Sequence, residues 1–334
     1  MRPVAPLAAA LAATTALALT ACAADPIVVD EAAPQSAAGP NLDEERIDAV
    51  LTEIQEALAD ADEAKDAELL GDRVSDAAAR TRAAQYAYAT ATGDSVPALN
   101  LTPQAVAITN SGTWPRAVFN ITESSSSNLP VVEVVVQDDA RSTYQLSSWA
   151  RLLGGTQITL PTADQGASVV EADSTGYVMT PDAAVTAYVD LLNSGSGQSE
   201  DFASDEFTKT YFDTTEKLSS SLAAAGSVTA AAERTEDPLI GIRMQDGSAL
   251  LAANLTYTLT YARTVAGSTM RLAGQTAAMN PGDEDTVAGT AAATYLVTVL
   301  LQIPSAQTGG AMQVVGAERV LESVTMDDSS TPDH

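Results

Sequence analysis

The sequence predicts an α+β protein built from two tandem modules, each with helices packed on a curved antiparallel sheet. Three observations support this prediction. Each half of the chain begins with amphipathic helical stretches, continues with segments that have the two-residue period of strands, and separates those segments by short turns. An apolar fraction of 46% is sufficient for a sizeable core.

The first module is expected over residues 41–160, and it opens with a helix. Asn41 and Glu44 have the spacing of a capping box, and the neighbouring acidic residues suit the positive end of a helix dipole. From Ile47 to Leu58 apolar residues recur at helical spacing, so one face of this helix is expected to be buried. Two helical stretches and then four strands follow, at residues 67–70, 75–93, 106–108, 117–121, 131–136 and 144–152.

The second module is expected over residues 180–326, after a linker at 161–179 that is rich in Pro, Gly, Asp and Ser. Thr180 and Pro181 supply an N-cap and a proline at the first helical position. A second helix is predicted over residues 205–225, and strands over 254–261, 295–303 and 313–326, with Gly316 as a bulge. Residues 327–334 are expected to be a disordered tail.

One alternative architecture remains open. Residues 131–136 are apolar on both faces, which would suit a central strand of one sheet shared by the two halves. In that case the chain would form one continuous fold.

The N-terminus has the layout of an export signal. Met1 to Pro3 is short and positive, and the uncharged run from Val4 to Leu19 would span only about 24 Å as a helix, less than the roughly 30 Å of a bilayer core. Leu19-Thr20-Ala21-Cys22 resembles the lipobox of bacterial lipoproteins. The resemblance implies that residues 1–21 are a signal peptide and that Cys22, the only cysteine, is lipidated. The alternative is an ordinary secretory signal cut near Ala24.

A lipid anchor at Cys22 would place the protein on the outer face of the cytoplasmic membrane. Residues 22–40 contain Ala, Pro, Ser and Asp without helical periodicity, and are interpreted as a flexible tether. The net charge of −28 excludes nucleic acid as a natural partner, because binding to phosphates requires clustered Lys and Arg. The excess of Arg over Lys is typical of actinobacterial proteins.

The sequence contains no recognisable catalytic or cofactor site. The only histidine is His334, and a lipidated Cys22 has no free thiol, so histidine-dependent and thiolate catalysis lack their central groups. None of the three lysines has a serine three residues before it, and no phosphate-binding or dinucleotide-binding loop is present. Asp138-Asp139 and residues 283–285 are interpreted as solvated acidic turns, so no metal and no cofactor is expected.

Two tryptophan segments complete the pattern, Trp114-Pro115-Arg116 and Trp149 to Leu153. With them the chain resembles uncharacterised actinobacterial cell-envelope lipoproteins, and the order of its elements resembles tandem cystatin-like or NTF2-like domains. The resemblance implies a concave sheet face, and Trp114 and Trp149 are expected in the core.

The favoured function is that of a non-catalytic ligand-binding or assembly module, with an envelope protein or a small molecule as partner. Two alternatives remain: a purely structural or interaction lipoprotein, and an isomerase- or dehydratase-type enzyme that uses Asp and Tyr in place of His.

Overall fold

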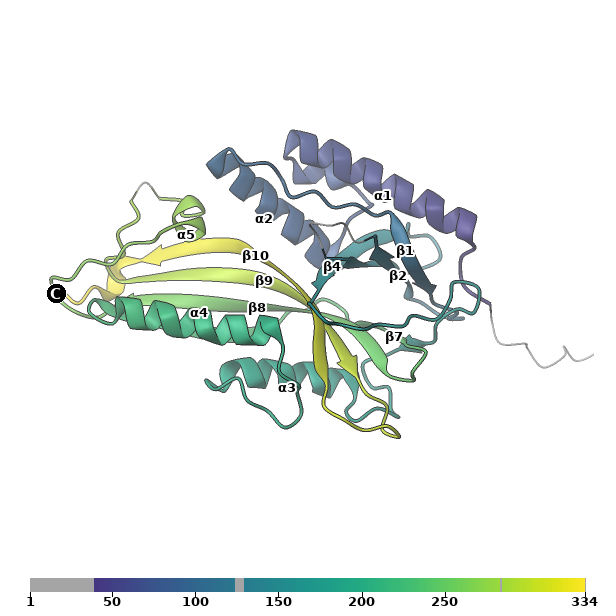
Figure 1. The fold of residues 1–334 in the computed structure, drawn as a ribbon. Helices are drawn as coiled ribbons and strands as arrows, with labels where there is room; N and C mark the ends of the chain where they lie inside the picture. Colours follow the sequence, from purple (N-terminus) through teal and green to yellow (C-terminus); the bar gives the residue numbers. More distant parts are fainter. Residues whose placement is uncertain (1–38, 124–128, 283, 334) are drawn as a thin grey trace, which may run out of the picture. The chain divides into compact units, whose positions relative to one another are not determined.

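Ten antiparallel strands form one sheet, and helices pack against it (Figure 1). The computed structural model describes residues 39–123, 129–282 and 284–333. The signal peptide, Cys22 and the tether as far as residue 38 lie outside the described residues. The predicted class, a mixture of helices and antiparallel strands, is confirmed.

The helices are α1 (Glu44–Ala64), η1 (Ala67–Leu70), α2 (Asp76–Thr92), α3 (Pro181–Asn193), α4 (Glu206–Leu222), α5 (Gln275–Ala278) and η2 (Asp328–Ser330). The strands of the first half are β1 (Pro103–Ile108), β2 (Arg116–Thr122), β3 (Val131–Gln137) and β4 (Gln145–Leu152). Those of the second half are β5 (Val169–Val170), β6 (Gly226–Arg234), β7 (Ile240–Arg243), β8 (Ala249–Arg263), β9 (Thr290–Ile303) and β10 (Gln313–Asp327).

The strand order is β1-β2-β3-β4-β10-β9-β8-β7-β5, and β6 also pairs with β8. Strand β8 is long enough to pair with β7 over its first part and with β6 over its last part. The two halves are joined where β4 meets β10, through Leu152 opposite Gly316 and Arg151 opposite Ala317. The junction is therefore short, but it makes the sheet continuous.

Gly316 allows this junction to form. A Cβ atom at this position would lie 2.8 Å from Leu300 Cδ1 and 3.1 Å from the carbonyl oxygen of Arg151. The register of β10 against β9 shifts between Val314 and Gly316, which confirms the predicted bulge.

The sheet curls until its two ends meet near residue 167. The Ala167 N–H donates to the carbonyl oxygen of Ile108 at 2.7 Å, and the Asn110 N–H donates to that of Ala167 at 3.0 Å. Inside the curl lies a core with side chains from both halves: Ala107, Ala117, Phe119, Ile121, Val132, Val134, Val136, Ala150, Leu160 and Ala167, with Ile240, Ile242, Met244, Leu250, Ala252, Leu300 and Val315. We call it the shared core.

Each half also has a core of its own under its helices. The side chains of α1 and α2 pack on β1 to β4 around Ile54, Leu58 and Trp149. Those of α3 and α4 pack on β6 and the long strands β8 to β10 around Tyr188 and Leu255. The apolar faces of the sheet under these helices are thus filled by the protein itself.

Several local predictions need correction. The cap of α1 is Asp43, whose carboxylate accepts from the Arg46 N–H at 2.9 Å, because Asn41 instead binds the end of β1. Trp114 is 40% exposed and lies under the Arg116 guanidinium at 4.6 Å, so its placement in the core was wrong. Trp149 is buried, as expected.

The segments expected to lack structure also make contacts. Residues 169–170 of the predicted linker form β5 against β7. In the tail expected to be disordered, Asp333 accepts a hydrogen bond from the buried Arg263 at 2.6 Å, which ties residues 328–333 to the end of β8. The division into two modules is not confirmed, because one sheet and a shared core join the halves.

Candidate functional site

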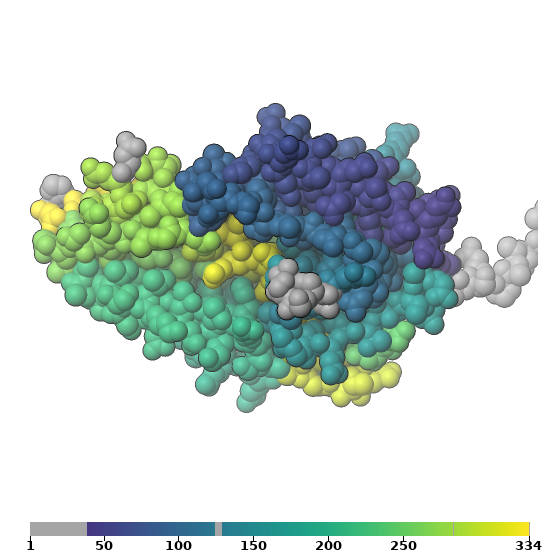
Figure 2. Space-filling view, turned by 45° about the horizontal axis from the view of Figure 1, so that its top comes forward, coloured from purple at the N-terminus to yellow at the C-terminus, as the bar shows by residue number. Residues whose placement is uncertain are grey.

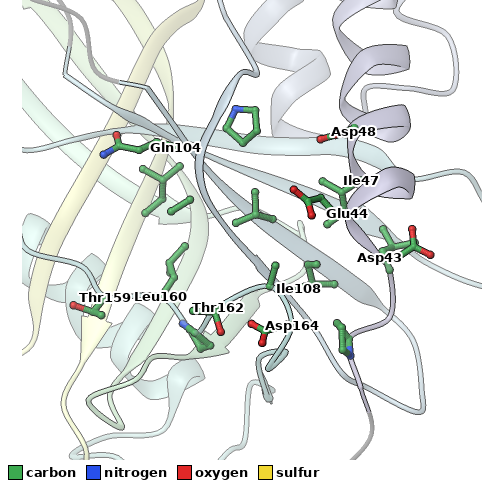
Figure 3. A pocket seen from close by; sticks show the side chains of 18 of the residues that line it. Asp43, Glu44, Ile47, Asp48, Gln104, Ile108, Thr159, Leu160, Thr162 and Asp164 are labelled. Carbon is green, nitrogen blue, oxygen red and sulfur yellow. The ribbon is translucent and has the colours of Figure 1, made fainter.

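A cavity of about 990 Å³ lies between the start of α1, the outer edge of β1 and the loop 158–164 (Figure 3). We call it the β1 pocket. Its size is at the upper end of the range usual for ligand sites. It is lined by Pro40, Leu42, Asp43, Glu44, Ile47, Asp48, Pro103, Gln104, Ala105, Val106, Ile108, Ile121, Ile158, Thr159, Leu160, Pro161, Thr162, Ala163 and Asp164.

Asn41 fixes the first wall of the pocket to the sheet. Its backbone N–H donates to the Thr109 carbonyl oxygen at 2.8 Å, and its side-chain oxygen accepts from the Thr109 hydroxyl at 2.9 Å and from the Ser111 N–H at 3.1 Å. Its side-chain amide donates to the Ser111 carbonyl oxygen at 2.8 Å. These bonds hold the first turn of α1 beside β1.

The loop 158–164 forms the opposite wall. Ala167, just beyond it, is hydrogen-bonded to β1, and the carbonyl oxygen of Thr159 accepts from the Gln245 N–H at 3.3 Å. The Thr162 carbonyl oxygen accepts from the N–H groups of Gln165 and Gly166, which closes a tight turn. The loop is thus attached at both ends and leaves a gap in front of β1.

The floor of the pocket is apolar. Ile47 and Ile108 come from the core under α1, and Ile121 and Leu160 come from the shared core. These four side chains are nearly fully buried, so the apolar surface that a ligand could remove from water is mainly that of the half-buried Leu42, Val106 and Ile158.

The rim of the pocket is acidic. Glu44 from α1 and Asp164 from the loop point toward the same space, with Ile108 between them (Figure 3). Asp48 lies one turn along α1, and no lysine or arginine is found among the described residues that line the cavity. The Thr162 hydroxyl donates to Asp164 and holds the pKa of that carboxyl below its usual value. An apolar floor with a negative rim suits a ligand that has an apolar body and a positive charge.

A second hollow lies where β10 runs between the first half and α4, and Figure 2 shows β10 in yellow at this place. Here the Arg319 guanidinium donates to the Tyr257 hydroxyl at 2.9 Å and lies 5.2 Å from the centre of the Tyr295 ring. The cavities on its two sides measure about 290 and 320 Å³. The Arg319 side chain fills the space between these two cavities and is already bound to Tyr257 and Tyr295. The hollow is therefore a weaker candidate for a ligand site than the β1 pocket.

The residues weighed for chemistry do not converge on a reactive site in the part of the chain described. Cys22, His334 and Asp283 lie outside the described residues. Asp139 accepts from the backbone N–H groups of its own turn, and no group of His, Cys, Asp or Glu side chains within 39–123, 129–282 and 284–333 could hold a metal ion.

Among the described residues, one hydrogen-bonded pair of a tyrosine and an aspartate forms, as an enzyme without histidine would need. The Tyr86 hydroxyl donates to Asp62 at 2.7 Å, between α2 and α1. Neither residue lines any of the cavities described above. Burial and this bond raise the pKa of Tyr86, so the pair acts as a packed contact between helices.

Comparison of the chain with protein-family models, with curated protein sequences and with solved structures finds no match. No helix among the described residues combines the length and the apolar character needed to cross a bilayer.

Sequence reasoning identified some residues of the pocket, but for other roles. The sequence predicts Glu44 as part of a capping box, Asp43 and Glu44 as acidic residues that suit the helix dipole, and Ile47 on the buried face of α1. The loop 158–164 was assigned mainly to a linker. One signal could have found the edge of β1: Pro103 opens the strand, and proline within a sheet is usually confined to edges and strand ends.

Proposed function

We propose that this chain is a membrane-anchored lipoprotein of the cell envelope that binds a ligand or a partner in the β1 pocket without catalysis. The observation that carries the proposal is the combination of an open apolar floor with a rim of carboxylates.

The finer fold assignment belongs to this proposal. Each half pairs helices with an antiparallel sheet and has its own core, which is consistent with tandem cystatin-like or NTF2-like domains of an actinobacterial lipoprotein family. In such domains the expected ligand site is the concave sheet face. Here the helices fill that face, so we place the site at the edge of β1 instead.

A pair of matched fluorescent probes tests the proposal. Dansylcadaverine has an apolar ring system and a positive amine, and dansylglycine has the same ring system and a negative carboxylate. We expect the mature chain of residues 22–334, with Cys22→Ser so that no detergent is needed, to bind dansylcadaverine with increased emission. Binding should weaken as salt is raised, because exposed charges are screened.

Variants of the rim locate the binding site. Each exposed ion pair contributes about 0.2–1 kcal/mol, so Glu44→Gln with Asp48→Asn should weaken dansylcadaverine binding about 2- to 30-fold. The matched control, Asp60→Asn with Glu63→Gln, makes the same change of charge at the exposed far end of α1 and should leave the affinity unchanged. Equal binding of both probes, or equal effects of both variants, would refute a cation site in the β1 pocket.

The anchor has its own test. Only the thiol of Cys22 can accept a diacylglyceryl group, so Cys22→Ser in the full chain should abolish labelling by radioactive palmitate and prevent normal maturation. Membrane fractionation and the apparent mass of the product check both expectations. If the variant were still processed and retained in the membrane, the chain would not be a lipoprotein of this kind.

A further inference from the structure

Strand β1 has an outer edge with which no other strand of the described part of the chain pairs over most of its length. The Thr109 N–H donates to the Ala117 carbonyl oxygen, and Ala107 lies opposite Phe119 two residues earlier. In an antiparallel ladder, hydrogen-bonded pairs alternate with non-bonded pairs. The N–H and C=O groups of Val106 therefore point away from β2, toward the β1 pocket.

Two residues further along the same edge, an outward backbone group of β1 already forms a hydrogen bond. The Ile108 carbonyl oxygen, which the register also directs outward, accepts from the Ala167 N–H at 2.7 Å. At Val106, no backbone partner occurs on that side among the residues that the structure describes. An unpaired edge of this kind is a template for strand addition.

The pocket has room for an added strand. It extends from Pro103 to Ile108 along β1 and from α1 to the loop 158–164 across it, with a volume of about 990 Å³. Four residues of β1, 103–106, correspond to about 13 Å of extended chain. Side chains on one face of an added strand would reach the apolar floor, and those on the other face would lie near the rim.

Charge decides which segment fits. Among the residues that the structure describes, the side chains of Glu44 and Asp48 have no hydrogen-bond or ion-pair partner, and Asp164 adds a third carboxylate. An acidic segment would be repelled, whereas lysine or arginine would be attracted. The chain's own Pro26 to Glu31 is apolar at its centre but carries Asp30 and Glu31, which disfavour it as the occupant.

We infer that the β1 pocket binds an extended basic segment of a partner protein as an added strand on β1. This inference rests on the proposed function, because it names the class of partner for the same pocket. Backbone hydrogen bonds to Val106 would supply the extended geometry, the apolar floor would hold alternate side chains, and the rim would select positive charge.

The test uses a capped hexapeptide of alternating lysine and valine and the chain of residues 22–334 with Cys22→Ser. We expect the peptide to bind, to displace dansylcadaverine and to shift the amide resonance of Val106. Two N-methylated peptides serve as controls: one is methylated at all valine N–H groups and the other at all lysine N–H groups. These two sets of N–H groups lie on opposite edges of an extended strand. One methylated peptide should therefore lose at least tenfold in affinity, and the other should bind much as the parent does.

A variant of the protein tests the hydrogen bond that the outward N–H of Val106 would donate to the added strand. Of the backbone donors of β1, Val106→Pro removes only the N–H that points outward, and Val106→Ala is the matched control that shortens the side chain but keeps the N–H. We expect the proline variant to weaken peptide binding about tenfold more than the alanine variant. If the proline variant does not fold, the two methylated peptides still decide the question on the unaltered chain.

The remaining outcomes separate the two proposals. If dansylcadaverine binds but the peptide does not, or if both methylated peptides bind like the parent, strand addition is refuted and the cation pocket stands. If the peptide binds with the expected dependence on methylation but dansylcadaverine does not bind, the pocket does not bind small cationic molecules. Strand addition by a partner protein then still stands. If Ile27→Ser, Val28→Ser and Val29→Ser together raise peptide affinity tenfold, the chain's own segment occupies the edge, which overturns a partner protein as the occupant.

Discussion

The fragment of residues 41–160, expressed alone, should fail to fold, although it contains helices, four strands and a core under α1 and α2. The reason is the shared core. Phe119, Val132 and Val134 are fully buried against side chains of the second half, among them Ile242 and Leu250. Removing that half would expose this whole face of the first sheet to water.

The free energy lost on exposing this face is comparable to the stability of a whole domain. Burying one large aliphatic or aromatic side chain contributes about 1.5–3 kcal/mol, so exposing Phe119, Val132, Val134 and Val136 alone would cost roughly 6–12 kcal/mol. Whole domains are stable by only about 5–15 kcal/mol. The fragment would also lose the ion pair between Arg80 and Glu322, at 2.7 Å, that links α2 to β10.

Circular dichroism and tryptophan emission measure the outcome. The fragment should show little cooperative thermal transition, and Trp149 should emit as if in water. As a control, the intact chain with a protease site inserted in the exposed segment 171–175 should stay folded and undivided after cleavage, because the two halves still share their core. A fragment 41–160 with native-like circular dichroism and a sharp transition would support two independent modules instead.

Local signals in the sequence predict the elements of the fold, but not the pairing that joins the two halves. Elements set by local signals were found: the apolar stripe of α1, Ser75 and Gly93 at the ends of α2, and Pro181 at the start of α3. Strand β7, only four residues long, was not identified, because its apolar side chains are too few to show a period.

Long-range pairing was the part that the sequence left open. Nothing local in Leu152 or Gly316 specifies that β4 pairs with β10, and nothing in Ala167 specifies that it joins β1. Only the apolar character of residues 131–136 on both faces suggested a larger sheet. The β1 pocket depends on the same pairings, since its walls come from segments more than a hundred residues apart, such as Glu44 and Asp164. Its acidic residues could be predicted, but not their convergence.

Glu133 illustrates another residue whose role only the structure shows, because it lies on β3 with no exposed surface. One carboxylate oxygen accepts from the Asn120 side-chain amide at 2.8 Å, and the other has no hydrogen-bond partner among the described residues. Burial raises the pKa of Glu133 from 4.5 to about 8, although the Asn120 hydrogen bond and the positive charge of Arg82 act in the opposite direction. Near neutral pH this side chain is therefore largely protonated in the folded protein.

Replacing Glu133 with Gln should consequently change the pH dependence of stability. Between pH 4.5 and about 8 the folded state holds a proton at Glu133 that the unfolded state has released, so stability is lost as pH rises through this range. Glu133→Gln cannot lose this proton and keeps an acceptor for Asn120. Its free energy of unfolding should be close to that of the wild type near pH 4 and should exceed it by a few kcal/mol above pH 8, on the order given by 1.36 kcal/mol for each pKa unit.

Urea unfolding at a series of pH values provides the measurement. The matched control is Glu233→Gln on β6, where the same substitution is made at an exposed position and should leave the difference from the wild type nearly constant with pH. A difference for Glu133→Gln that does not grow with pH, or a variant that is less stable at every pH, would mean that Glu133 is ionised in the folded protein. In that case Glu133 would need Arg82 as a buried counter-ion, and Arg82→Met should then destabilise the wild type more at pH 8 than at pH 4.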